Sequence, residues 1–128
     1  MTLTIEQVKS EPAGNRMDNW IAECVMKWKL NLGSNIYEGI NGDWHLPEDH
    51  EFSQDIASAW EVVEKVHYCK VMKFTHEPIP ELDSEGKVFY QCELHFDDYF
   101  TRYAEAETAP LAICRAALLC VLEKGSLQ

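Results

Sequence analysis

The segment from Leu111 to Leu122 constrains the fold most, because it is apolar on nearly every side of a helix. Arg115 is its only charged residue, and Thr108 and Pro110 are suited to the cap and the first turn of a helix that starts just before it. Such a helix must be buried on more than one side. We therefore expect it to lie between a sheet and another helix, or between subunits, and a homodimer is one way to cover it.

Apolar residues also recur at helical spacing in two earlier segments. The first stripe ends near Gly33 and consists of Met17, Trp20, Ile21, Cys24, Val25 and Trp28. The second begins at a potential N-cap, Ser53, continues to about His67, and includes Ile56, Ala57, Trp60, Val63 and Val66. A short helical turn is expected over residues 4–9. Because Trp20, Trp28 and Trp60 occupy these stripes, we expect all three to be buried.

Strand patterns fill most of the region between the second stripe and the C-terminal helix. Residues 69–76 and 88–96 alternate, and the connection between them contains two prolines and Gly86, which favours an antiparallel pair. Residues 99–105 can return as a third strand. Residues 30–52 are rich in turn formers and predict an irregular segment with at most a small hairpin at Asn41–Gly42. The order of elements predicts one α+β domain over residues 1–128, with an at least three-stranded, mainly antiparallel sheet covered by helices.

Composition limits the classes of function. The 128 residues suit one domain, and 22 acidic against 11 basic side chains give a net charge of −11, which argues against direct binding of nucleic acid or anionic membranes. The five cysteines show no C-x-x-C spacing, as expected of reduced thiols. No apolar run could span a bilayer and the N-terminal residues lack the order of a signal peptide, so a cytoplasmic protein is expected.

Three stretches together resemble the phage ABA-sandwich domain family of bacteriophage and prophage proteins. They are A-G-N-R-M-D-N-W-I-A-E-C-V-M-K-W (13–28), D-I-A-S-A-W-E-V-V-E-K-V (55–66) and Y-A-E-A-E-T-A-P-L-A-I-C-R-A-A-L (103–118), about a third of the chain. The resemblance implies a phage or prophage origin and an α/β/α layered fold. It implies no activity, because the family has no shared biochemical function. Residues 29–52 and 70–98 follow no family pattern, so a specific function is expected to lie there.

The motifs that carry enzyme chemistry are missing from the sequence. There is no phosphate-binding glycine loop, and His45, His50, Asp43 and Asp49 have no metal-ligand spacing such as H-E-x-x-H. A small metal-dependent hydrolase built on His45, Asp49 and His50 is therefore only a third hypothesis. We predict neither catalytic residues nor a metal or other cofactor.

Arg115 is the most informative single residue, because burying a guanidinium without an acceptor is costly. A carboxylate of Glu23, Glu61 or Glu105 is the expected structural partner. Anion binding is the alternative, and Arg102 and Arg16 are further candidates for it. On that alternative the protein would sequester a nucleotide signal, with Trp44 or Phe89 stacking on the base.

Charge is distributed unevenly along the chain. Eight acidic residues and no Lys or Arg lie between Lys29 and Lys65, and four acidic residues lie between Lys73 and Lys87. Such segments keep a protein soluble, or they steer it onto a basic partner. The leading hypothesis is a small non-enzymatic phage accessory protein, a counter-defence inhibitor that binds a host nuclease or other defence protein with a basic surface. The expected partner-binding residues are Asp43, Trp44, Glu48, Asp49, Glu51, Glu81, Asp83 and Glu85.

Overall fold

The computed structural model describes residues 3–31, 33, 36–39, 42–66, 68–76, 87–95 and 101–126. Its helices are α1 (Ile5–Ser10), α2 (Asn15–Cys24), α3 (Ile56–Val63), α4 (Ala109–Ser126) and a 3-10 turn, η1 (Pro47–Asp49). Its strands are β1 (Lys29–Asn31), β2 (Ile36–Glu38), β3 (Trp44–His45), β4 (Tyr68–His76), β5 (Lys87–His95) and β6 (Thr101–Ala106). The expected α+β class is confirmed.

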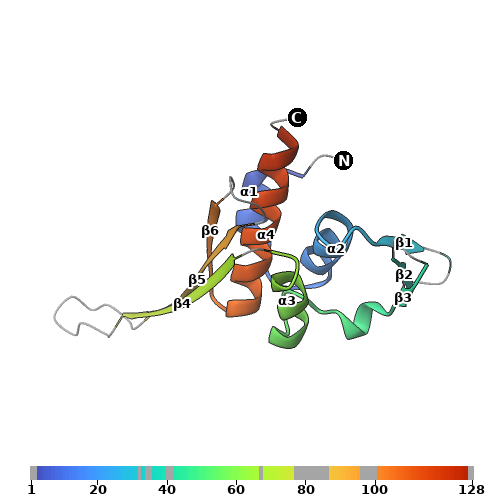
Figure 1. Ribbon diagram of the computed structural model, residues 1–128. Helices are drawn as coiled ribbons and strands as arrows, with labels where there is room; N and C mark the ends of the chain where they lie inside the picture. The colour runs from blue at the N-terminus through green and yellow to red at the C-terminus, as the bar shows by residue number, and fades with distance from the viewer. Residues whose placement is uncertain are drawn as a thin grey trace.

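The larger sheet has the order β4-β5-β6, and both pairings are antiparallel. Period-2 alternation decides which side chains of this sheet are buried. Cys92 and Leu94 of β5, with Ala104 and Ala106 of β6, are buried on the face that packs against α4. Figure 1 shows this sheet on one side of α4, with β4 and β5 extending away from the helices.

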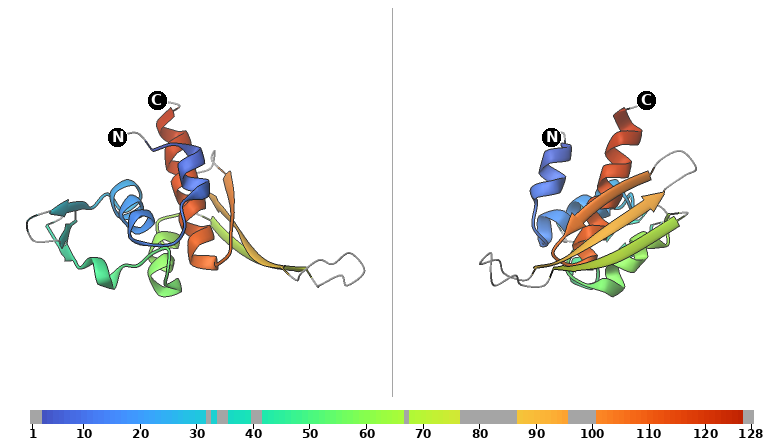
Figure 2. Two further views of the ribbon diagram at one scale, coloured as in Figure 1. Left: turned by 180° about the vertical axis from the view of Figure 1, so that it is seen from behind. Right: turned by 90° about the vertical axis from the view of Figure 1, so that its left-hand side faces the viewer.

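Helix α4 is the centre of the domain. It packs against β5 and β6, and α1, α2 and α3 contact its other sides (Figure 2). Its residues from Leu111 to Cys120 are buried except for Arg115, which is half-buried. Coverage on several sides, expected from the sequence, is therefore confirmed, and it comes from within one chain. Within the described residues, no helix is both long enough and apolar enough to cross a membrane.

The short elements of residues 29–52 form a second sheet, with the order β1-β2-β3 and antiparallel pairing. The sequence predicted an irregular segment here with at most one hairpin. The structure places the β2–β3 hairpin at the expected site, where Gly42 adopts a φ of +81° that favours glycine. Asn41 lies outside the described residues. β1 adds a third strand that the turn-rich sequence did not reveal.

Two expectations about α3 were wrong. Its N-cap is Asp55, whose carboxylate accepts a 3.0 Å hydrogen bond from the Ser58 N–H, and not Ser53. Trp60 is 52% exposed, because α3 packs on α4 through the opposite face, which carries Ser58, Ala59 and Val62. Trp28 is buried in the core, as expected, at 9% exposure, and Trp20 is half-buried at its edge.

Ser53 has a different role, as the partner of a buried carboxylate. Asp18 of α2 is 5% exposed, and its Oδ1 accepts hydrogen bonds from the Ser53 N–H at 2.7 Å and the Ser53 hydroxyl at 2.6 Å. Gln54 donates to Oδ2 at 3.0 Å, and the Gly14 N–H donates to the Ser53 hydroxyl at 3.0 Å. These bonds satisfy a charge that would be costly to bury alone, and they fasten α2 to the turn before α3.

Replacing Ser53 with Ala should lower the free energy of unfolding by about 1–3 kcal/mol, because the buried Asp18 carboxylate loses a donor. Ser10→Ala is the matched control. Ser10 is exposed, so we expect a change within about 0.5 kcal/mol. Urea unfolding of both variants measures the difference, and equal stabilities would contradict this role of Ser53.

Truncation to Ala should reduce stability much more at Trp28 than at Trp60. Trp28→Ala removes a core side chain and should cost about 3–5 kcal/mol. Trp60→Ala removes a side chain that is half in solvent, so its cost should be well below that of Trp28→Ala. Thermal melts that rank the two variants in the reverse order would show that α3 packs through its other face.

Candidate partner-binding surface

Residues 28–54 connect α2 to α3 and form a lobe at the side of the helices, which we call the acidic lobe (Figure 1). In its two-residue strand β3, neighbouring side chains point to opposite faces. Trp44 points outward and is 75% exposed, whereas His45 packs inward against Trp28. An indole this exposed gains nothing from folding, which is typical of a contact residue.

Four exposed carboxylates belong to the same lobe: Asp43, Glu48, Asp49 and Glu51. The prediction placed these residues together with Trp44, and the structure brings all five into the lobe. The sequence from Leu30 to Glu64 contains no Lys or Arg. The other predicted contact residues, Glu81, Asp83 and Glu85, lie outside the described residues.

A small cavity of about 270 Å³ opens between α2 and the lobe. Asp18, Glu48 and Glu51 contribute carboxylates, and the remaining lining comes from Asn15, Asn19, Leu30, Tyr37 and Pro47. Burial and, secondly, the negative charges of Asp18 and Glu23 raise the pKa of Tyr37, whose hydroxyl donates to the Asn19 side chain. The cavity is therefore lined mainly by polar groups, with Leu30 and Pro47 among its apolar residues, and has a negative potential.

A cluster of rings extends the hydrophobic core into the lobe. The Trp28 indole stacks on His45 with ring centroids 3.8 Å apart and planes 7° apart, and it also contacts Tyr37, His50 and Phe52. Tyr37 and Phe52 are fully buried. This cluster holds β2, β3 and the segment after η1 against the end of α2.

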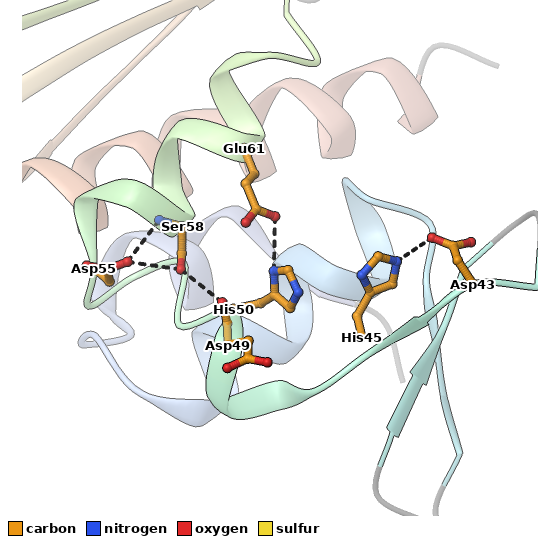
Figure 3. Close-up of polar contacts among 7 residues, drawn as sticks. All are labelled: Asp43, His45, Asp49, His50, Asp55, Ser58 and Glu61. Atoms are coloured by element: carbon orange, nitrogen blue, oxygen red, sulfur yellow. Dashed lines mark hydrogen bonds and ion pairs between the residues drawn. The ribbon is translucent and has the colours of Figure 1, made fainter.

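Each histidine of this cluster is paired with a carboxylate (Figure 3). His45 Nε2 lies 2.5 Å from Asp43 Oδ2, and His50 Nδ1 lies 3.0 Å from Glu61 Oε2 of α3. Sequence reasoning missed the role of Glu61, because no pattern links residues eleven positions apart on different elements. Figure 3 shows the Asp49 carboxylate pointing away from both rings, so His45, Asp49 and His50 do not converge as the hydrolase hypothesis requires. Among the described side chains, no group of three or more His, Cys, Asp and Glu could hold a metal ion.

Arg115 of α4 forms no ion pair with a carboxylate of the described residues, which corrects the expected pairing with Glu23, Glu61 or Glu105. Its terminal nitrogens donate to two backbone carbonyls, those of Glu105 and Glu11, both at 2.9 Å. Its buried Nε has no partner in the described part of the chain. Burial lowers the pKa of Arg115, and the charge of Glu107 partly offsets this. The guanidinium thus joins α4 to the end of β6 and to the connection between α1 and α2.

The other two arginines proposed for anion binding do not join Arg115 in one pocket. Arg16 is exposed and forms an ion pair with Glu11 at 3.6 Å. Arg102 is opposite Leu94 in the sheet, and its side chain lies outside the described set. A cavity of about 640 Å³ is lined by Arg115 and Phe89, with Glu105, Glu107, Thr108 and Leu111 among the other lining residues. Trp44 and Arg16 do not line it.

The sequence was then compared with known proteins. The Phage ABA sandwich domain matches residues 19–118, which is most of the chain. The chain belongs to this family. The match includes the acidic lobe, the larger sheet and α4 as far as Leu118, so it also covers residues 29–52 and 70–98, which lie outside the three stretches. Neither the search of curated proteins nor the search of solved structures found a match.

Arg115→Ala should lower the free energy of unfolding by about 1–3 kcal/mol, because the carbonyls of Glu11 and Glu105 lose their donor. Arg16→Ala removes an exposed ion pair and should change the free energy of unfolding by less than about 1 kcal/mol. Chemical denaturation of the two variants gives the comparison. If Arg115→Ala were as stable as wild type, these hydrogen bonds would not contribute to folding.

Proposed function

We propose that the protein is a small non-enzymatic phage accessory protein that inhibits a host defence protein, such as a nuclease, in the host cytoplasm. The acidic lobe is the surface that binds this partner. The observation that carries the proposal is Trp44, 75% exposed and surrounded in sequence by the exposed acids Asp43, Glu48, Asp49 and Glu51. Family membership supports the phage setting.

The chemistry of the lobe favours a basic partner. An uncompensated acidic surface repels itself and therefore slightly opposes folding, but it accelerates the approach of a positively charged protein. Proteins that handle nucleic acid carry such positive surfaces. The lobe supplies both parts of a binding interface, since the charges steer the encounter and the indole offers a large apolar contact.

The cavity beside Glu48 and Glu51 gives this interface a specific contact. A long basic side chain of the partner can place its methylenes against Leu30 and Pro47 and its charge beside the carboxylates. Its entry would bring the partner's surface over the lobe.

The test uses two triple charge reversals that change the net charge equally. Glu48→Lys/Asp49→Lys/Glu51→Lys alters the lobe, whereas Glu6→Lys/Glu105→Lys/Glu107→Lys alters exposed acids elsewhere. A host protein captured by wild type is purified, and its association with each variant is measured at several salt concentrations. We expect the lobe variant to associate at least about ten times more slowly at low salt, and the control to remain close to wild type.

A Trp44→Ala variant separates the apolar contact made by the indole from the electrostatic steering by the acids. It should leave the association rate nearly unchanged and speed dissociation, at a cost of about 2 kcal/mol or more in binding. Equal effects of the two triple reversals would show that only net charge matters. If the affinity did not depend on salt concentration and none of the three variants changed it, the lobe would not be part of the interface.

The cavity beside Arg115 supports a second candidate function, the sequestration of a small nucleotide-like ligand. Its volume lies in the range of ligand sites, and it combines a guanidinium with an aromatic residue, Phe89. Mass spectrometry of protein purified from infected cells would detect such a ligand. Retention by wild type and its loss from Arg115→Ala would favour this candidate over the first.

A further inference from the structure

His45 and His50 lie next to one another inside the acidic lobe. Their ring centroids are 5.2 Å apart and their planes are nearly perpendicular, at 80°. The two residues come from different elements, β3 and the segment after η1, and the Trp28 indole contacts both rings. Figure 3 shows the nitrogens that are not paired with carboxylates, His45 Nδ1 and His50 Nε2, turned toward one another.

The carboxylates determine what these two nitrogens can do. A neutral imidazole donates from one nitrogen and accepts at the other. Since a carboxylate only accepts, the protons of the neutral rings belong on His45 Nε2 and His50 Nδ1, which face Asp43 and Glu61. His45 Nδ1 and His50 Nε2 then present lone pairs, and in the described part of the chain neither has a hydrogen-bond partner.

Two lone pairs that face each other cannot bond to one another, but one metal ion between them can accept both. We propose that His45 and His50 bind one divalent transition-metal ion of the class that prefers imidazole, such as Zn²⁺, Ni²⁺ or Cu²⁺. Zn–N bonds of about 2.0–2.1 Å are short enough to fit one ion between rings at this separation. Water molecules complete the coordination, because the protein supplies two ligands.

The surroundings of the rings match those of metal-binding histidines. Such histidines typically donate their second ring nitrogen to a carboxylate, which fixes the ring and makes the other nitrogen more basic. Asp43 and Glu61 are placed to do this, one for each ring. Their charges and those of the neighbouring acids offset the charge of a divalent cation, and the side chains of His45 and His50 are 22% and 15% exposed, which leaves the site open to solvent.

This site is independent of the proposed partner, so its test needs only the purified protein. Titration with Ni²⁺, Zn²⁺ and Cu²⁺, followed by calorimetry, should give one saturable site per chain. Bound Cu²⁺ should also quench the fluorescence of Trp28, which stacks on His45. Because the ion must compete with protons for the imidazoles, binding should weaken as the pH falls.

Variants distinguish this site from the five free thiols, since thiols in general are also ligands for these metals. His45→Gln and His50→Gln should each lower the affinity by at least about tenfold, and Glu61→Gln should lower it by about 10- to 100-fold, as expected for a carboxylate behind a ligand. His95→Gln, a histidine of β5 beside Glu93, is the matched control and should bind like wild type. Circular dichroism confirms that each variant is folded.

Co²⁺ provides a second readout, since thiolate ligands produce a strong near-ultraviolet charge-transfer band that imidazole and water ligands do not. We expect bound Co²⁺ without this band. The proposal is overturned if no metal binds saturably, if binding persists in the double variant His45→Gln/His50→Gln, or if the thiolate band appears.

Discussion

The burial of α4 is the constraint on which the rest of the structure depends. A helix with apolar residues on every side loses stability wherever water reaches it, so each side must be covered. The larger sheet covers one side, and α1, α2 and α3 take the others. Residues 28–54 join this core through Trp28, Tyr37 and Phe52.

The acidic lobe is held by an extension of the main core and by one buried polar anchor. Trp28, Tyr37 and Phe52 supply the apolar surface, and His45 and His50 pack among them. The Asp18 carboxylate, bonded to Ser53 and Gln54, ties the end of the lobe to α2. A lobe held in this way can expose Trp44 and its acidic residues on a fixed frame, which lowers the entropic cost of binding a partner.

Charged residues serve different purposes at the two sides of the domain. Arg115 is bound by carbonyls at the junction of α4, β6 and the α1–α2 connection, so its charge is used to join segments. The acids of the lobe have no such bonding role at most positions and face solvent. Asp43, which orients His45, and Glu38, which accepts a hydrogen bond from Asn31, are exceptions. Glu61 of α3, outside the lobe, orients His50.

Local sequence determined the elements that depend on neighbouring residues. The apolar run of α4, the alternation of β4, β5 and β6, and the glycine of the β2–β3 hairpin all act over a few residues, and each was predicted near its observed place. The three stretches of family pattern also indicated the family that the match over residues 19–118 shows. The turn-rich segment without Lys or Arg singled out Trp44 as a candidate contact residue, and the structure shows that its side chain is exposed.

Tertiary structure decided the features that depend on which surfaces meet. α3 has apolar residues on two faces, so periodicity alone could not show that Ala59 and Val62 would be buried and Trp60 exposed. Ser53 looked like a helix cap because its hydroxyl suits that role, but the carboxylate of Asp18, 35 residues earlier, binds it instead. Arg115 took carbonyl acceptors from two separate segments, and Glu61 reached His50 from another element. These partners are distant in sequence, and only the packing of the elements around α4 and the folding of the lobe bring them within bonding distance.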